Sequence, residues 1–144
     1  MSATGSAEQG ENIAIGKIAD LINDRDIITV NPELTVREAS RLMAEKRIGA
    51  VVVLEDAEVA GIFTERDLLN RVVGADRDPD ATTLAEVMTT NPTTVTPADT
   101  IEDVVAWMLS GRYRHLPVLD DGHLIGIVSQ GDVMAYVRSR WLTD

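Results

Sequence analysis

Residues 61–68 read Gly-Ile-Phe-Thr-Glu-Arg-Asp-Leu, and residues 126–133 repeat the pattern as Gly-Ile-Val-Ser-Gln-Gly-Asp-Val. In both stretches an apolar run ends in a hydroxyl residue, and an aspartate follows three positions later. A hydroxyl residue with an acid at this spacing is typical of the first turn of a helix. The two stretches therefore predict the same local structure, a strand that runs directly into a helix.

The repeat extends well beyond these two stretches. Adding 65 to any position between 29 and 72 gives its counterpart without a gap. The matched pairs include Pro32 with Pro97, Thr35 with Thr100, Met43 with Met108, Arg47 with Arg112 and Asp56 with Asp121. A repeat of this length in a chain of 144 residues predicts two similar half-domains that close on a shared core.

Composition excludes several classes of protein. Of the 144 residues, 44% are hydrophobic, none is cysteine, and the formal net charge is −11. No apolar run approaches the roughly 18 residues of a membrane-spanning helix, and the negative charge opposes binding to nucleic acid or anionic membranes. Without cysteine there is no disulfide, thiolate nucleophile or cysteine-ligated metal. Residues 1–12 lack the features of a signal peptide and are expected to be a disordered N-terminus, so we expect a cytoplasmic protein.

Hydrophobic periodicity and turn residues predict the elements of each copy. In the first copy they are a helix over 13–22, a strand over 27–30, a helix that Thr35 and Glu38 cap and that ends near Arg47, strands over 50–54 and 59–63, and a helix from Thr64 to about Val73. In the second copy they are a helix over 84–88, a strand over 93–96, a helix capped by Thr100 and Asp103, strands over 115–119 and 124–128, and a helix from Ser129 to Trp141.

These elements define a mixed α/β (α+β) fold of two repeats, each with the order β-α-β-β-α after a short first helix. The expected domains are a first repeat over 13–73, an acidic linker over 74–82 and a second repeat over 83–144. Two such repeats predict pseudo-twofold symmetry, with equivalent clefts between facing sheets. Trp107, the counterpart of Leu42, is expected in the core, and Trp141 is a candidate for a dimer contact.

The positions of Asp67 and Asp132 support two interpretations. With Thr64 and Ser129 they form ordinary capping boxes that start helices. A carboxylate in the first turn of a helix can also accept hydrogen bonds from both hydroxyls of a ribose, as an acid does in dinucleotide-binding folds. Both copies place the acid directly after a Gly-apolar strand, which favours a ligand-binding role beside the capping role.

Three motifs carry a resemblance to a known family. They are Pro-x-x-Thr before a helix, the segment Arg112-Tyr113-Arg114-His115-Leu116-Pro117-Val118, and the box Gly-Ile-x-Thr/Ser-x-x-Asp. In order, spacing and duplication these motifs are similar to tandem cystathionine-β-synthase (CBS) domains, and the resemblance covers about residues 16–140. The chain thus resembles a stand-alone CBS pair, also called a Bateman module.

This resemblance implies a regulatory sensor module and not an enzyme. The resemblance implies that adenosine nucleotides bind in the clefts between the copies. The expected ligands are most often AMP, ADP or ATP, and in some cases NADH or S-adenosylmethionine. The resemblance also implies no required cofactor, no metal site, a homodimer, and an energy- or redox-sensing role that is passed on by conformational change. It also implies a partner protein that the module regulates.

Carried onto this chain, the resemblance implies two nucleotide sites. Site A would consist of Thr64, Asp67, Pro92, Thr93, Arg114 and His115, and site B of Ser129, Asp132, Ile27, Ile28, Gly49 and Ala50. The aspartates would hold ribose, and Arg114 with His115 would hold phosphate. Their counterparts are the uncharged Gly49 and Ala50, so we expect tighter binding at site A, with Arg66 as a candidate to supply charge at site B. The alternative roles are a solvated strand edge for Arg114 and a hydrogen-bonded structural position for His115.

Two other functions compete with nucleotide sensing. A constitutive dimeric adaptor would keep the fold and bind no ligand. An enzyme would need Ser129, His115 and Asp132 as a nucleophile triad, but no glycine-rich nucleophile elbow surrounds Ser129. Residues 76–80 resemble the start of a calcium loop, yet Ala81 occupies the position where such a loop requires glycine.

Overall fold

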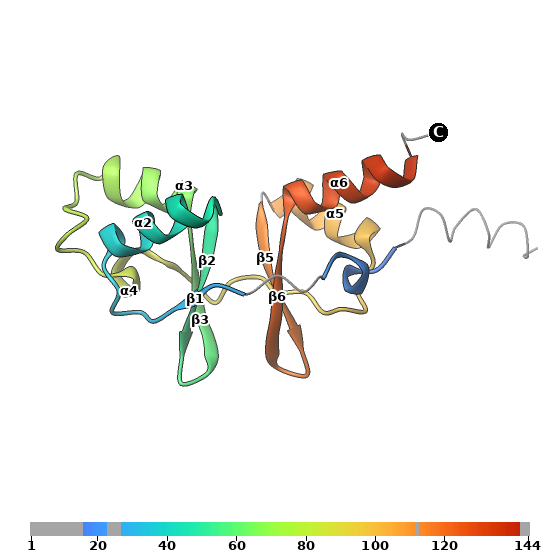
Figure 1. The fold of residues 1–144 in the computed structure, drawn as a ribbon, viewed down its shortest axis with the longest axis horizontal. Helices are drawn as coiled ribbons and strands as arrows, with labels where there is room; N and C mark the ends of the chain where they lie inside the picture. The colour runs from blue at the N-terminus through green and yellow to red at the C-terminus, as the bar shows by residue number, and fades with distance from the viewer. Residues whose placement is uncertain (1–15, 23–26, 112, 142–144) are drawn as a thin grey trace, which may run out of the picture. The chain divides into compact units, whose positions relative to one another are not determined.

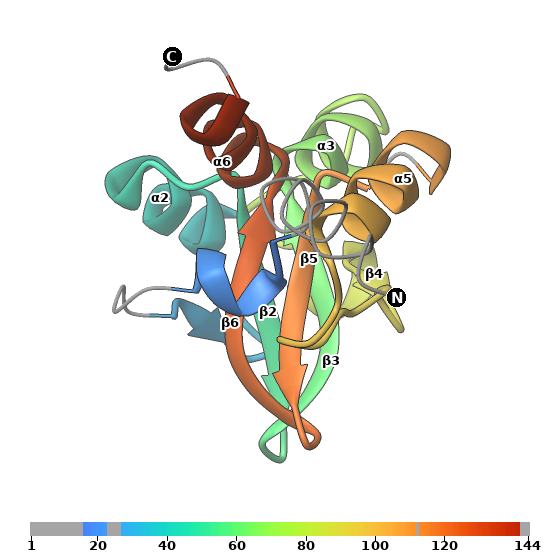
Figure 2. The ribbon, with the colours of Figure 1, turned by 90° about the vertical axis from the view of Figure 1, so that its right-hand side faces the viewer.

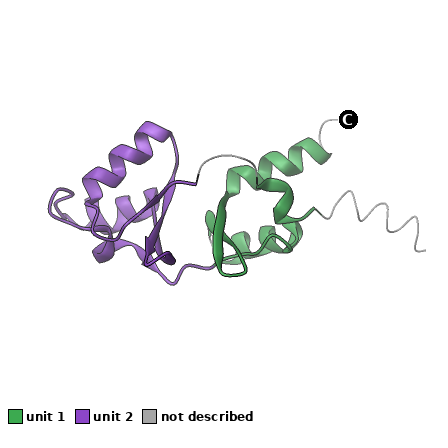
Figure 3. Cartoon of the chain, turned by 60° about the horizontal axis from the view of Figure 1, so that its bottom comes forward, with its two compact units in different colours: residues 1–25, 94–144 green, residues 26–93 purple. Residues whose placement is uncertain are grey.

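The computed structural model describes residues 16–22, 27–111 and 113–141. Figure 1 shows the helices and strands, and the backbone divides into two compact units. Unit 2 spans residues 26–93, and unit 1 combines residues 1–25 with residues 94–144 (Figure 3). The predicted disordered N-terminus, residues 1–12, lies outside the described residues.

Unit 2 is built on a four-stranded sheet with the strand order β1-β2-β3-β4. β1 pairs parallel with β2, whereas the β2–β3 and β3–β4 pairs are antiparallel. The elements of this unit are β1 (Thr29–Val30), α2 (Val36–Lys46), β2 (Ala50–Glu55), β3 (Glu58–Thr64), α3 (Glu65–Asp67), η2 (Leu68–Val73), α4 (Leu84–Val87) and β4 (Thr89–Thr90). Mixed pairing with helices packed beside the sheet confirms the predicted α/β (α+β) class.

Unit 1 is built on an antiparallel hairpin. Its described elements are η1 (Ile18–Leu21), α5 (Ile101–Gly111), β5 (His115–Asp120), β6 (His123–Ser129) and α6 (Gln130–Trp141). Figure 2 shows the turn of this hairpin directed away from α5 and α6. Both predicted strands and the predicted final helix are therefore confirmed, with ends shifted by at most one residue.

The first helix of each sequence repeat lies in the compact unit of the other repeat. In unit 1, the Ile18 N–H of η1 donates to the Asp99 carbonyl at 2.9 Å. In unit 2, the Leu84 N–H of α4 donates to the Leu34 carbonyl at 2.9 Å. Sequence repeats and compact units therefore do not coincide. The predicted repeat boundaries and the pseudo-twofold symmetry stay predictions.

Each unit has a hydrophobic core of its own. The core of unit 2 takes side chains from α2, β2, β3, η2 and α4: Val36, Ala39, Met43, Val51, Val53, Phe63, Val72, Leu84 and Val87. The core of unit 1 consists of Ile18, Val95, Ile101, Val104, Met108, Leu116, Val118, Val128 and Val133. Full burial of one such side chain contributes about 1.5–3 kcal/mol relative to leaving it exposed. These two cores hold the strand-to-helix turns that carry the predicted site residues.

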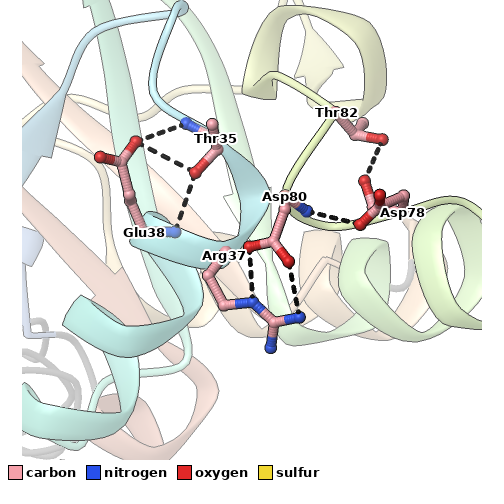
Figure 4. Close-up of polar contacts among 6 residues, drawn as sticks. All are labelled: Thr35, Arg37, Glu38, Asp78, Asp80 and Thr82. Carbon is pink, nitrogen blue, oxygen red and sulfur yellow. Dashed lines mark hydrogen bonds and ion pairs between the residues drawn. The ribbon is translucent and has the colours of Figure 1, made fainter.

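Helix α2 begins at the capping box that the sequence predicts. The Glu38 N–H donates to Thr35 Oγ1 at 3.1 Å, and the Thr35 N–H donates to Glu38 Oε1 at 3.0 Å (Figure 4). The pKa of Glu38 is lowered mainly by the hydrogen bond from the Thr35 backbone and further by the one from the Thr35 side chain. Arg47 ends the helix in the left-handed conformation, with a φ of 58°. Its N–H then reaches the carbonyls of the last turn.

The acidic segment predicted as a linker packs against the start of α2. Arg37 Nε lies 2.9 Å from Asp80 Oδ1, and the hydrogen bond from this guanidinium lowers the pKa of Asp80 (Figure 4). Thr82 is buried, and its hydroxyl donates to the Asp78 carbonyl at 2.7 Å. The Val36 N–H donates to the Thr82 carbonyl at 2.8 Å, so this segment satisfies a backbone donor at the helix start.

The prediction of a strand over 93–96 is wrong. In the described part of this region only Val95 bridges, in parallel with Val118, through a Val95 N–H bond to the Pro117 carbonyl at 3.0 Å. A longer ladder is disfavoured because Pro92 and Pro97 flank the segment and have no N–H to donate. The chain pairs earlier instead, as β4, which joins the sheet of unit 2.

The core position predicted for Trp107 was also wrong, because its side chain is 37% exposed. The buried side of α5 is formed by Ile101, Val104 and Met108. Trp107 precedes Met108 and is therefore turned about 100° away from that stripe. The side chain of Trp141, a candidate dimer contact, lies outside the described side chains.

The helix predicted from Thr64 to Val73 has the expected length but an unexpected geometry. It starts as α3 and continues as η2, where the turns widen. At its end the Gly74 N–H donates to the Leu69 carbonyl at 2.7 Å, a spacing of five residues. Such π-helical turns occur in natural proteins mostly as short insertions, frequently at functional sites.

The two hairpin turns have the same backbone shape but different residues. Asp56 and Ala57 join β2 to β3 with φ values of 53° and 67°. Asp121 and Gly122 join β5 to β6 with φ values of 54° and 81°. Positive φ at both central residues defines the type I′ turn, which favours glycine at the second position. Ala57 therefore holds a strained conformation that Gly122 avoids.

We predict that Ala57→Gly raises the free energy of unfolding by about 1 kcal/mol, because glycine removes the Cβ penalty of the left-handed conformation. The matched reverse change, Gly122→Ala, should lower it by a similar amount. A Cβ at residue 122 would meet no atom within 4 Å, so only the backbone cost remains. Urea unfolding of both variants measures the effect, and an unchanged midpoint for Ala57→Gly would contradict the strain.

Candidate functional site

The Thr64-x-x-Asp67 box lies at the turn from β3 into α3. The Asp67 N–H donates to Thr64 Oγ1 at 3.2 Å, and the Thr64 N–H donates to Asp67 Oδ2 at 3.0 Å. Both bonds of a capping box are present, so the structural interpretation of this motif is confirmed. The same bonds hold the carboxylate at the end of the strand, where the first turn of the helix offers partial positive charge.

Asp67 has further partners that the sequence interpretation missed. Its residue surface is 7% exposed, which is low for an ionised carboxylate. The Thr89 hydroxyl lies 3.2 Å from Asp67 Oδ1 and 3.4 Å from Oδ2, and Arg71 Nε lies 3.6 Å from Oδ1. The carboxylate is therefore compensated by one cation and by hydroxyl and backbone donors, as a buried acid requires.

Arg71 and Thr89 tie the Asp67 box to the segment around β4. Besides Asp67, the Arg71 guanidinium reaches the Met88 carbonyl at 3.1 Å and the Val87 carbonyl at 3.4 Å. The spacing of four residues between Asp67 and Arg71 is visible in the sequence and is a signal for an ion pair on a helix. Thr89 has no such signal, because it lies 22 residues from Asp67 and meets it only through the sheet.

The Ser129-x-x-Asp132 box repeats this geometry at the turn from β6 into α6. The Asp132 N–H donates to Ser129 Oγ at 3.0 Å, and the Ser129 N–H donates to Asp132 Oδ2 at 2.9 Å. Asp132 is half-buried, whereas Asp67 is buried. The counterpart of Arg71 is Tyr136, whose ring lies against Gly16 and under the guanidinium of Arg140. The two boxes thus share their capping bonds and differ in the residue four positions after the acid, which is Arg71 in one and Tyr136 in the other.

Within each unit, strand register brings other predicted site residues to the boxes. Ala50 lies opposite Thr64 in the β2–β3 ladder, and the Gly49 carbonyl accepts the Glu65 N–H at 3.0 Å. In the β5–β6 ladder His115 lies opposite Ser129, and the Arg114 carbonyl accepts the Gln130 N–H at 2.8 Å. Residues opposite each other in a ladder share one face of the sheet. Gly49 and Ala50 therefore lie beside Thr64, and Arg114 and His115 lie beside Ser129.

The remaining predicted residues all belong to unit 2. Pro92 and Thr93 follow β4, Ile27 and Ile28 precede β1, and Arg66 lies in the first turn of α3. Thr93 and Arg66 are exposed, and Ile28 packs partly against the core. Sites A and B as combined from the sequence each draw on residues of both units, and these combinations stay predictions.

Other kinds of site find no support among the described residues. No group of three or more histidine, cysteine, aspartate or glutamate side chains in residues 16–22, 27–111 and 113–141 is arranged to hold a metal ion. None of the helices in that part of the chain combines the length and apolarity needed to cross a bilayer. The two boxes are the strongest candidates for a functional site in the described structure.

Comparison with known families matches the chain twice to the CBS domain, over residues 18–74 and 84–139. The CBS domain-containing protein YhcV of Bacillus subtilis (strain 168) is 36% identical over 107 residues, which are 74% of this chain and 76% of YhcV. Other curated relatives are longer, and the chain spans between 16% and 62% of their length.

Solved structures with the same fold include other CBS proteins. The CBS-domain containing protein ATU1752 from Agrobacterium tumefaciens has a TM-score of 0.78 and is 37% identical, covering 83% of this chain and 98% of that one. CBSX2 in complex with AMP has a TM-score of 0.71 and is 26% identical, covering 85% of this chain and 96% of CBSX2.

We predict that Asp67→Ala lowers the free energy of unfolding by about 2 kcal/mol, because it leaves Arg71 and Thr89 without their buried partner. Asp103→Ala is the matched control. Asp103 is the acid at the same position of the Thr100 box on α5, but it is exposed. Replacing Asp103 should lower the free energy of unfolding clearly less than replacing Asp67. Equal decreases in this free energy, measured by urea unfolding, would contradict the role of the buried network.

Proposed function

The chain belongs to the CBS domain family, and we propose that it is a regulatory module that binds an adenosine-containing ligand at its two strand-to-helix boxes. The ligands proposed are AMP, ADP and ATP, with NADH and S-adenosylmethionine as further candidates. On this proposal the protein does not transform the ligand. Occupancy of the boxes instead changes a conformation that a regulated partner reads.

The observation that carries the proposal is the duplicated carboxylate. Each carboxylate accepts the backbone N–H of the hydroxyl residue in its box, and the hydroxyl oxygen of that residue accepts the N–H of the aspartate. The four bonds of Asp67 and Asp132 measure 2.9–3.2 Å. A carboxylate is an acceptor only, and its two oxygens match the two adjacent hydroxyls of a ribose. Capping fixes the acid before any ligand arrives, so binding would lose little side-chain entropy there.

The base and phosphate of a nucleotide need other partners. Arg114 is exposed and His115 half-buried beside the Ser129 box, and their position supports a role in phosphate binding. Arg66, exposed in the first turn of α3, is a second candidate for that role. Backbone groups of Ile27, Ile28, Pro92 and Thr93 are proposed to meet the base, as implied by the family.

Further support for an adenosine ligand comes from a solved relative. CBSX2 was solved in complex with AMP. The CBS domain pair of MJ0100 was solved with 5′-methylthioadenosine and S-adenosyl-L-methionine, but at 21% identity that structure supports the fold alone. Ribose and adenine are common to the five proposed ligands, whereas phosphate is absent from S-adenosylmethionine. The proposal therefore commits to the adenosine moiety and leaves the substituent to experiment.

A constitutive dimeric adaptor is the second candidate, and exposed apolar side chains favour it. Leu69 and Met134 are 62% and 53% exposed, and they occupy equivalent positions in the last helix of the two repeats. Val73, four residues after Leu69, is 61% exposed. Exposed apolar residues that share a helix face indicate a protein contact, which we propose is a second copy of the chain. A homodimer is compatible with both functions.

A thermal-shift series on the purified full chain distinguishes the two functions. The ligands to be tested are AMP, ADP, ATP, NADH and S-adenosylmethionine. A ligand at a hundred times its dissociation constant adds about 2.7 kcal/mol to the free energy of unfolding, so we predict a rise of several degrees with at least one of the five. Asp67→Asn and Asp132→Asn should each reduce this rise, and the double variant should abolish it, because the amide donates where the ribose hydroxyl also donates.

The control variant for this series is Asp103→Asn, which changes the same box position on α5 and should keep the full rise. A rise that survives in the double variant would contradict ribose binding by the boxes. No rise with any ligand in the wild type would favour the adaptor. Recovery of unchanged nucleotide after long incubation is the expected result if the protein is not an enzyme.

A further inference from the structure

The Asp67 carboxylate already has internal donors at the atoms that a ribose would need. The Thr64 N–H and the Thr64 hydroxyl lie 3.0 Å and 3.2 Å from Oδ2, and the Thr89 hydroxyl lies closest to Oδ1, at 3.2 Å. Arg71 Nε also faces Oδ1, at 3.6 Å. Because an ionised carboxylate only accepts, the Thr89 hydroxyl must be the donor in its contact with Asp67. With 7% of the Asp67 surface exposed, an incoming hydroxyl that approaches Oδ1 competes with the Thr89 hydroxyl for that oxygen.

Thr89 is the partner that can leave most readily. The Thr64 N–H and hydroxyl both belong to the cap of α3, where the hydroxyl also accepts the Asp67 N–H at 3.2 Å, so their loss would undo the helix cap. The Arg71 guanidinium is also held by the Met88 carbonyl at 3.1 Å. A threonine hydroxyl, in contrast, moves by rotation about one side-chain bond. Thr89 is half-buried, so its hydroxyl can turn toward the ligand or the solvent.

The strand that carries Thr89 is weakly held. β4 is two residues long and lies at the edge of the sheet, with Thr89 opposite Ile62 and Thr90 opposite Gly61. Only three residues separate its end from the boundary at which the chain leaves unit 2, after Thr93. The Thr89–Asp67 hydrogen bond therefore fastens the last strand before the chain crosses from one compact unit to the other.

We propose that Thr89 is an internal competitor for the ligand at Asp67, and that ligand capture releases β4 by taking this hydroxyl's place. The proposal rests on the proposed function and adds to it the affinity-setting residue and the element that responds. Occupancy at Asp67 then loosens the segment that joins the two units. The device belongs to the Asp67 box, where Arg71 stands beside the acid, while the Asp132 box has Tyr136 at the corresponding position.

The test is the affinity of Thr89→Val for AMP, measured by calorimetric titration of the full chain in an Asp132→Asn background that leaves one box intact. Valine keeps the shape of threonine and removes the competing donor. We expect AMP to bind about ten-fold more tightly, which corresponds to roughly 1.4 kcal/mol. Thr90→Val is the matched control, because Thr90 is the neighbouring, exposed threonine of the same strand, and it should leave the affinity unchanged.

A weaker or unchanged affinity in Thr89→Val would overturn the proposal, since a residue that merely positions Asp67 must weaken binding when it is removed. If the Asp132→Asn protein binds AMP and Asp67→Asn abolishes that binding, the proposed function stands whatever Thr89→Val does. If the protein binds no AMP at either box, the proposed function fails for AMP and this inference falls with it.

Hydrogen–deuterium exchange gives a second readout that a positioning role would not move. Peptides over residues 88–93 should exchange faster in the wild type with AMP than without it. In Thr89→Val without AMP they should already exchange at the faster rate, and Thr90→Val should behave as the wild type. Slower exchange of these peptides on AMP binding would contradict the release of β4.

Discussion

The reciprocal hydrogen bonds between a hydroxyl residue and the acid three positions later are the interaction on which this structure depends. They start α2 at Thr35 and Glu38, α3 at Thr64 and Asp67, α4 at Thr83 and Glu86, and α6 at Ser129 and Asp132. In α3 and α6 the same bonds hold a carboxylate at the end of a buried strand. Capping and ligand binding are therefore compatible roles, because the first positions the group that the second would use.

The two compact units are each completed by a piece of the other repeat. Helix η1 is held in unit 1 by backbone bonds such as Ile18 to Asp99, and α4 is held in unit 2 by bonds such as Leu84 to Leu34. Ile18 and Leu84 are fully buried in the respective cores. A repeat cut at its sequence boundary would lose these side chains from its core. The connecting segments are therefore structural parts of the units. The acidic stretch around Asp80 is one of them, because it packs against the start of α2.

The two copies carry different residues at several equivalent positions of the same local structure. Gly122 suits a turn in which Ala57 is strained, although both hairpins have the same shape. Arg71 compensates a buried Asp67, whereas Tyr136 stands in its place near a half-buried Asp132. The capping bonds remain common to both boxes. Duplication has therefore kept the means of placing the two acids and changed what surrounds them, which is where a difference in ligand affinity would arise.

The sequence by itself determined the elements whose causes are local. The boxes at Thr35, Thr64 and Ser129, the paired strands and the final helix follow from residues within a few positions of one another, and the structure confirms them. Only the tertiary structure decided that β4 forms at Thr89–Thr90 instead of over 93–96, that Trp107 lies outside the core, and that Thr89 contacts a buried Asp67. Strand pairing and the contact of Thr89 with Asp67 join residues far apart in the chain, and local spacing carries no information about such partners.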